Sequence, residues 1–167
     1  AGESPLATIE QEVNGLSLIL LQDLAANPAS LTTTASDPAA DCTAPAISAD
    51  GTRIVFASNS SLFTPPGTGL GEIFLYSVAT ATYERVSNRP FWSGSGADPD
   101  ARTPDISGDG RVVCFAAGDG GFIADDNNGF TDIFVVADGV TELCSRAPGA
   151  TPADADATGP RLNADGR

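Results

Sequence analysis

The sequence predicts an all-β protein, and three observations support this prediction. The chain has 18 glycines and 12 prolines among its 167 residues, so its apolar stretches are short and separated by turn-forming residues. No long stretch carries apolar residues at the 3.6-residue period of a helix. Asp-Gly pairs, which favour the positive φ of tight hairpin turns, recur at residues 50, 109 and 165.

The same segment recurs along the chain. The Asp-Gly pairs, 59 and 56 residues apart, align PAISADGTRIVFAS (45–58), PDISGDGRVVCFAA (104–117) and PRLNADGR (160–167). EIFLYSV at 72–78 matches DIFVVAD at 132–138 in the same phase, with LILLQDL at 18–24 as a degenerate earlier copy. Landmarks that recur in one order at nearly one spacing indicate internal repeats.

Each repeat is expected to contain four short antiparallel strands. In the first full repeat, 46–48 leads into the Asp-Gly turn and 53–57 leaves it, and the strands 72–78 and 83–87 follow. Four short strands in a repeat of this length are typical of a propeller blade.

The connections 58–71 and 117–131 are long and rich in Gly, and we expect them to be surface loops. A helix can be argued for 9–24, but the phase of the repeat favours a strand in its second half.

The repeat borders give two full blades, at 45–100 and 104–159. The last two strands of an earlier blade are expected at 16–36, and the first strand of a further blade at 160–167. Because unpaired edge strands tend to associate, we expect other copies of the chain, or the remainder of a longer chain, to complete the half-blades. The chain does not begin with Met, which also fits a processed chain or a piece of a longer one.

A motif of Pro, Ser-x-Asp-Gly and an apolar strand, followed by a second strand with Ile-Phe, marks both full repeats. Its residues are Pro45, Ser48, Asp50, Gly51, Phe56, Ile73 and Phe74, then Pro104, Ser107, Asp109, Gly110, Arg111, Phe115, Asp132, Ile133 and Phe134. Over roughly 16–167 the chain resembles the TolB-like propeller repeats, relatives of the WD-repeat class. Such repeats occur in periplasmic translocation proteins, in the propellers of prolyl oligopeptidase-like enzymes and in many secreted proteins. The resemblance therefore implies a fold rather than one activity.

Composition excludes several functions. The chain has no His and no Lys, which removes Ser-His-Asp catalysis and Schiff-base chemistry from this chain alone. A net charge of −14 argues against nucleic-acid binding. No apolar stretch approaches the ~18 residues of a membrane span, so no membrane insertion is expected. The acidic, Lys-free composition fits a secreted or high-salt setting, and equally a genome whose base composition favours Ala, Gly and Arg.

The segment 125–132 (DDNNGFTD) is the sharpest candidate site. Its oxygen-bearing side chains resemble a calcium loop, since Ca²⁺ takes 6–8 oxygen ligands, although the segment does not match the EF-hand pattern. The candidate ligands are Asp125, Asp126, Asn127, Asn128 and Asp132. The TolB-like resemblance implies an Asp/Asn-rich turn here, which an Asx turn would organise without metal. Ca²⁺ is the one cofactor that the sequence suggests.

The remaining candidates have structural alternatives. Asp50 and Asp109 are expected in turns, and the acidic stretches 98–100 and 154–156 in solvated connections or in contact with cations or a basic partner. Phe91 and Trp92, in a polar connection, are expected either to anchor an interface or to fold back over a blade edge.

Four phenylalanines at strand positions are expected in the core, namely Phe56, Phe74, Phe115 and Phe134. Of the three cysteines, Cys114 and Cys144 are expected to be buried in strands. Cys42 is expected to be an exposed loop thiol.

Three functions follow from these observations. The first is a non-catalytic, extracytoplasmic propeller module (secreted, periplasmic or at the cell surface) that binds a protein partner. Its recognition loops would be 58–71, 88–103, 117–131 and 146–159. The second is a structural subunit that assembles into a closed oligomer or filament by completing half-blades between chains. The third is the propeller of a larger prolyl oligopeptidase-like hydrolase, whose catalytic domain this chain lacks.

Overall fold

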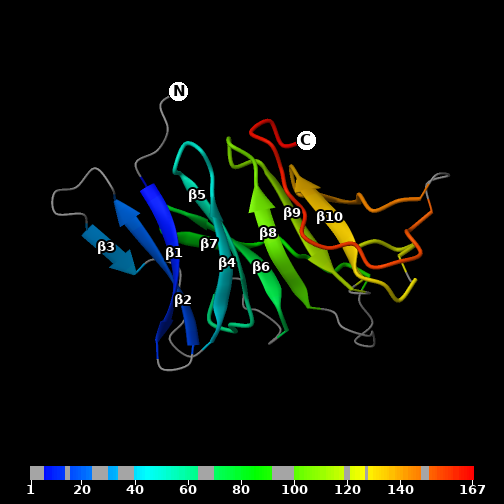
Figure 1. The fold of residues 1–167 in the computed structure, drawn as a ribbon, viewed down its shortest axis with the longest axis horizontal. Helices are drawn as coiled ribbons and strands as arrows, with labels where there is room; N and C mark the ends of the chain where they lie inside the picture. The colour runs from blue at the N-terminus through cyan, green and yellow to red at the C-terminus, as the bar shows by residue number, and fades with distance from the viewer. Residues whose placement is uncertain are drawn as a thin grey trace.

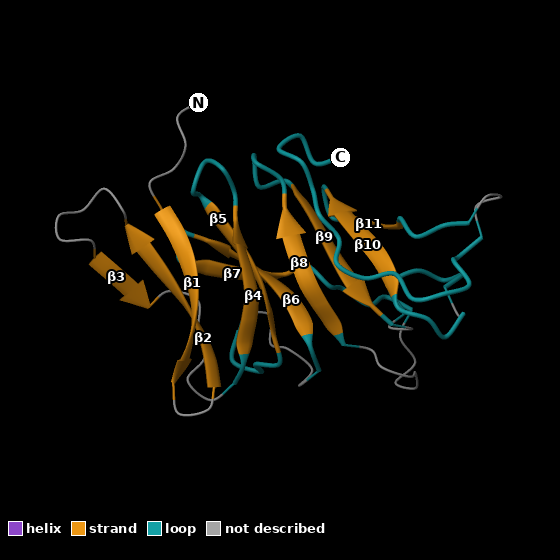
Figure 2. Cartoon of the chain, in the orientation of Figure 1, coloured by secondary structure: helices purple, strands orange, loops and turns teal. Residues whose placement is uncertain are grey.

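The computed structural model describes residues 6–13, 16–23, 30–33, 40–63, 70–91, 100–118, 121–126, 128–147 and 151–167. Within these ranges every regular element is a β-strand (Figure 2), which confirms the predicted fold class. The described residues also contain no helix long and apolar enough to cross a membrane.

The strands form three antiparallel sheets that follow one another along the long axis of the molecule (Figure 1). The first contains β1 (Leu6–Val13), β2 (Leu16–Asp23) and β3 (Ser30–Thr33). The second contains β4 (Cys42–Ile47), β5 (Arg53–Ser58), β6 (Glu72–Ser77) and β7 (Thr82–Arg85). The third contains β8 (Ala101–Ile106), β9 (Val112–Ala117), β10 (Asp132–Ala137) and β11 (Val140–Leu143). In each sheet the spatial order of the strands follows the sequence, as in propeller blades.

The N-terminal part contains one strand more than expected. β1 pairs with β2 along its whole length, from Leu6 opposite Asp23 to Val13 opposite Leu16. The segment 9–24 therefore forms parts of two strands and no helix. The second sheet likewise begins at Cys42, three residues before the expected blade boundary at 45.

The second and third sheets repeat irregular details as well as strands. The register of β4 shifts between Thr43 and Ala46, and that of β8 shifts between Arg102 and Asp105. Each bulge contains one residue in the left-handed region, Ala44 with φ of 51° and Thr103 with φ of 49°. The repeat seen in the sequence thus extends to the backbone path of the first strand of each blade.

The expected aromatic core is confirmed, because Phe56, Phe74, Phe115 and Phe134 are all fully buried. The two long connections are not wholly at the surface, however. Phe63 and Phe122, 59 residues apart, fold back from them and are also buried. Each packs with its ring centroid within 6 Å of the two strand phenylalanines of its own sheet.

Two of the cysteine expectations are wrong. Cys42 lies in β4 and is fully buried, with its Sγ 3.4 Å from Ser58 Oγ, because the strand starts earlier than expected. Cys144 follows the end of β11 and is exposed. Its counterpart in the repeat, Val86, is buried in the cluster between the second and third sheets. Cys144 lies on the opposite face of the third sheet, which no described sheet covers. Cys114 is buried in β9, as expected.

Residues 160–167 form no strand, in contrast to the expectation of a first strand of a further blade. They nevertheless follow the path of β8 one repeat later. The Gly110 backbone approaches the Arg53 side chain of the preceding sheet, and Gly166 approaches Val112 in the same way. No described strand lies beside this segment to supply ladder hydrogen bonds. The segment therefore takes the position that β8 has in the third sheet, one repeat later, without pairing to another strand.

The acidic connections have structural roles in this arrangement. Asp100 Oδ1 accepts a hydrogen bond from the Gly71 amide at 2.7 Å, and Asp156 Oδ1 accepts one from the Thr131 amide at 2.8 Å. In return, the Ala101 and Ala157 amides donate to the carbonyls of Gly71 and Thr131. These carboxylates therefore tie the start of one repeat to the preceding sheet.

Candidate functional site

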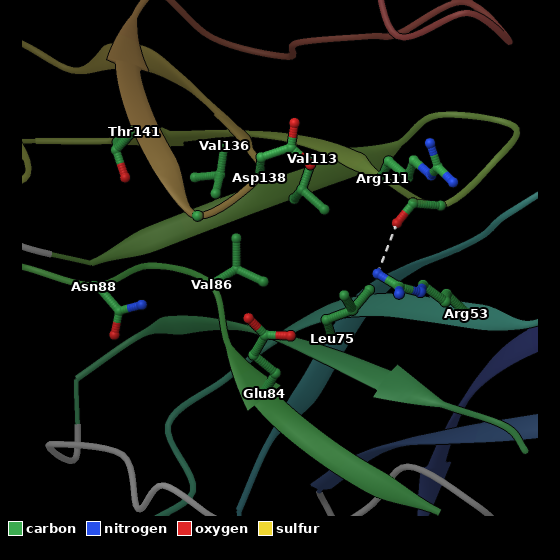
Figure 3. Close-up of a pocket in the computed structure, with 12 residues that line it drawn as sticks. Arg53, Leu75, Glu84, Val86, Asn88, Arg111, Val113, Val136, Asp138 and Thr141 are labelled. Carbon is green, nitrogen blue, oxygen red and sulfur yellow. Dashed lines mark hydrogen bonds between the residues drawn. The ribbon is translucent and has the colours of Figure 1, made fainter. Parts of the chain in front are cut away.

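A groove of about 490 Å³ lies between the second and third sheets (Figure 3). Its apolar surface comes from four strand or strand-end side chains, Leu75, Val86, Val113 and Val136. Arg53, Arg111, Glu84 and Asp138 supply charge along it, and Asn88 and Thr141 supply neutral polar groups. The first strand of each sheet, β4 or β8, is called its inner strand, and the last, β7 or β11, its outer strand. The groove exists because the two twisted sheets pack closely near their inner strands and diverge towards their outer strands.

One end of the groove is cationic, and Gly110 makes this end possible. Arg53 Nη1 donates a hydrogen bond to the Gly110 carbonyl at 3.2 Å. Gly110 has φ of 72°, and a Cβ at this position would lie 2.9 Å from Arg53 Cδ. The next residue, Arg111, has a 77% exposed side chain whose only ion pair in the described chain is at 4.0 Å, to Asp109. Figure 3 shows both arginines at the same end of the groove.

The middle of the groove is acidic. Glu84 comes from β7, and Asp138 from the tight turn between β10 and β11, where its φ is 51°. Both residues are exposed. Within the described chain neither carboxylate forms a hydrogen bond or an ion pair, so both are available to a ligand.

A second hollow of about 430 Å³ continues the groove and shares Asn88, Gly139 and Thr141 with it. Arg85 and Arg89 line this part. Arg85 Nη1 lies 3.4 Å from Oε1 of the buried Glu72. Arg89 Nη2 donates to the Gly71 carbonyl at 3.0 Å, and its guanidinium lies 4.9 Å from the centre of the Phe122 ring.

The environment of Arg89 is reflected in its pKa. Burial lowers the pKa of this guanidinium, and the nearby carboxylates of Glu72 and Asp100 oppose that change. Arginine remains charged throughout the physiological range despite such a shift. Arg89 is therefore a fixed positive charge against the wall of the groove.

The charge of this region contrasts with that of the whole chain. Four of the eight basic residues, Arg53, Arg85, Arg89 and Arg111, line the two hollows, together with two acidic residues, Glu84 and Asp138. The lining thus carries a formal charge of +2, while the chain carries −14. Such a local excess favours ligands that carry carboxylate groups.

The predicted interface pair is described only in part. Phe91 is 57% exposed and lines the second hollow, at the rim of the groove. Trp92 lies outside the described residues. Of the predicted recognition loops, 88–103 contributes Asn88 to the groove and 88–91 to the second hollow, where 117–131 adds Phe122 and Ile123.

The residues of the proposed calcium loop mostly contact protein groups. Asp132 accepts hydrogen bonds from Ser145 Oγ and, at 2.8 Å, from Asn128 Nδ2. Asn128 Oδ1 accepts a hydrogen bond from the Phe130 amide at 2.9 Å, which is an Asx turn.

Asp125 faces Arg146, with its Oδ2 3.7 Å from the Arg146 Nη1. Asp126 is buried, and Asn127 lies outside the described residues. No three acidic or cysteine side chains of the described chain gather as metal ligands would. The contacts favour the Asx-turn interpretation, and Ca²⁺ binding stays a prediction.

Sequence reasoning missed the charged residues of the groove. Arg111 directly follows an Asp-Gly pair, and Arg53 lies one residue further from its own pair. The two arginines therefore occupy different repeat positions, but the presence of a scarce residue type beside both turns was a usable signal. Glu84 and its counterpart Glu142 also recur in phase. What the sequence could not show is that Glu84 of one repeat and Arg111 of the next line the same groove.

No protein-family model matches the chain, and no curated protein matches it. Among solved structures, the crystal structure of TolB from Acinetobacter baumannii is similar, with a TM-score of 0.57 at 21% sequence identity. The match covers 97% of this chain and 33% of that chain. The structure of putative TolB from Agrobacterium tumefaciens has a TM-score of 0.57 at 18% identity, covering 85% of this chain and 47% of that chain.

A third structure is acylaminoacyl peptidase in complex with Z-Gly-Gly-Phe-chloromethyl ketone. It matches with a TM-score of 0.43 at 15% identity, over 79% of this chain and 21% of that chain, and this similarity carries no inference. The chain spans a third to a half of the length of the two TolB structures. These comparisons and the three successive sheets confirm, at the level of fold, the resemblance to the TolB-like β-propeller repeats.

Proposed function

We propose that the chain is a non-catalytic propeller module that binds an extended segment of a partner polypeptide between its second and third sheets. The observation that carries this proposal is the groove itself. It is elongated by the second hollow, apolar side chains lie among its polar ones, and its exposed charged side chains have few partners in the described chain. These are the features expected of a surface that binds a peptide rather than a compact small molecule.

A catalytic role has less support. Glu84 and Asp138 are the acidic groups of the groove, and no Ser or Cys nucleophile lines it with them. The chain itself contains no His or Lys that could serve as a base. We further propose an extracytoplasmic location, secreted, periplasmic or at the cell surface. The TolB-like fold and the acidic composition support this location.

A blocking substitution tests the proposal. Thr141 lies on β11 and lines both hollows, so Thr141→Trp would fill the groove. A library of fluorescein-labelled ten-residue peptides is screened against the wild type by fluorescence polarisation. We expect peptides that bind the wild type to lose at least tenfold in affinity for Thr141→Trp. The control Thr80→Trp, in the exposed turn after β6, should bind as the wild type does. Equal binding by all three proteins would contradict the proposal.

A second candidate function is self-assembly by completion of half-blades, and the path of 160–167 favours it. This segment takes the position of an inner strand on the third sheet, and β1 is an edge strand of the first sheet. In the second sheet, β4 corresponds to residues 160–167 and β5 corresponds to β1, and these two strands pair with each other. Residues 160–167 of one copy would pair in the same way with β1 of another.

Native mass measures this assembly directly. Light scattering after size exclusion should give a mass that is a multiple of 16.9 kDa and that rises with concentration. Deletion of 160–167 should abolish the assembly and leave the strands folded by circular dichroism. A monomer at all concentrations would exclude the second candidate and leave the peptide-binding proposal intact.

A further inference from the structure

We infer that the groove selects a bipolar peptide segment, in which an acidic and a basic side chain flank an apolar one. This inference rests on the proposed function and names the class of segment bound. It follows from the order of the chemical groups along the groove.

The arginine end would receive the acidic side chain. Arg53 is held in place by its bond to the Gly110 carbonyl, and the guanidinium of Arg111 is exposed beside it. Two guanidinium groups at one end provide the planar, multiple donors that suit a carboxylate. Arg53 keeps one donor engaged with the protein and has others to offer.

The acidic middle would receive the basic side chain. Glu84 and Asp138 face the groove from the two sheets that border it (Figure 3). Both carboxylates are exposed and carry negative charge at the groove, so they would attract a cation bound there. An ammonium or guanidinium group of the ligand would supply that cation, since no described cation pairs with either carboxylate.

The apolar side chain would pack on Leu75 and Val113, which line the groove between the arginine end and the two carboxylates (Figure 3). In an extended peptide, alternate side chains point to the same side. The three recognised side chains would therefore stand at positions i, i+2 and i+4. The probe that follows from this spacing is Asp-Ser-Val-Ser-Lys within a neutral Gly/Ser peptide.

Three labelled peptides test the inference at 0.15 M salt: the acid–Val–base probe, an acid–Val–acid peptide and a base–Val–base peptide. The wild type should bind the bipolar probe about fivefold more tightly than either of the others, a difference at the upper end of what one exposed ion pair contributes. Because the chain carries −14, nonspecific attraction alone would instead favour the base–Val–base peptide.

Charge-reversal variants assign each end of the groove. Arg111→Glu should shift the preference to the base–Val–base peptide, and Glu84→Arg should shift it to the acid–Val–acid peptide. Arg167→Glu and Glu142→Arg make the same charge changes one repeat later, outside the groove. These two controls should keep the order of affinities of the wild type. Both target residues are exposed, so the variants should fold, and circular dichroism checks this.

The outcomes separate this inference from the proposed function. Equal affinity for all three peptides, with binding still lost in Thr141→Trp, would overturn the charge order and keep the groove as a binding site. A wild-type preference for the base–Val–base peptide, shared by every variant, would also overturn the inference. The absence of any binding would overturn both proposals.

Discussion

At the scale of single residues, the same hydrogen bonds occur in both full repeats. Ser48 Oγ donates to Asp50 Oδ1 at 2.6 Å, and Ser107 Oγ donates to Asp109 Oδ1 at 2.7 Å. Each carboxylate also accepts a hydrogen bond from the backbone amide two residues later, at 3.0 Å for Thr52 and 3.1 Å for Arg111. The Asp-Gly pairs are thus turn-forming units, in agreement with the sequence-based expectation.

These hydrogen bonds predict an acid-dependent effect. The Ser107 hydroxyl and the Arg111 amide lower the pKa of Asp109 below its ordinary value of 3.8. Because the folded-state pKa is the lower one, the stabilisation is present above the unfolded pKa and is lost as pH falls through the folded pKa. In Ser107→Ala the pKa of Asp109 should return towards 3.8, as followed by NMR titration of the carboxyl carbon.

The same variant should lose stability at neutral pH. Ser107 Oγ also accepts a hydrogen bond from the Val112 amide at 2.9 Å, so we expect a loss of about 1–3 kcal/mol in the free energy of unfolding. The part of this loss that comes from Asp109 should vanish as pH falls through the lowered folded-state pKa of Asp109. Ser61→Ala, at an exposed site, is the control. An unchanged Asp109 pKa in Ser107→Ala would contradict this account.

At the scale of elements, each four-stranded sheet contains one phenylalanine from a connecting loop that packs against two phenylalanines of its central strands. Phe56 and Phe74 lie on β5 and β6 with Phe63 against them, and Phe115 and Phe134 lie on β9 and β10 with Phe122 against them. Phe122 is 2% exposed although it lies outside the strands. The connection between β9 and β10 is therefore part of the core of its sheet.

Truncation of this loop residue should be as damaging as truncation of a core strand residue. We expect Phe122→Ala to lower the free energy of unfolding by about 3–5 kcal/mol, because it leaves a cavity between two buried rings. Leu62→Ala, at a side chain 70% exposed, should change it by less than about 0.5 kcal/mol. Urea denaturation compares the two variants. Similar small losses in both would show that the connection is not part of the core.

Strands and turns could be predicted because their signals are local and recur. Asp50 and Asp109 mark the hairpins, and the strand phenylalanines mark the buried faces. β1 was missed although the sequence between it and β2, Asn14-Gly15, is itself a hairpin signal. Cys144 was misplaced because burial at its position depends on whether another sheet covers that face, which is not a local property.

At the scale of the whole molecule, the groove depends on how two sheets meet. Its cationic end combines Arg53 and Arg111, which are far apart in the sequence, so no single motif encodes the groove. Packing of the inner strands fixes the two sheets, and Gly110 lets the turn of one sheet rest against Arg53 of the other. The result is a groove with exposed charges between the two sheets, where we propose that a peptide binds.

Chemical-shift mapping on the ¹⁵N-labelled chain, titrated with the acid–Val–base peptide, would locate the binding site on the two sheets. We predict that the perturbed amides cluster at 84–88, 110–113 and 136–141, with those of 160–167 and β1 unchanged. Perturbations that cluster away from the second and third sheets, or none at saturating peptide, would contradict the account.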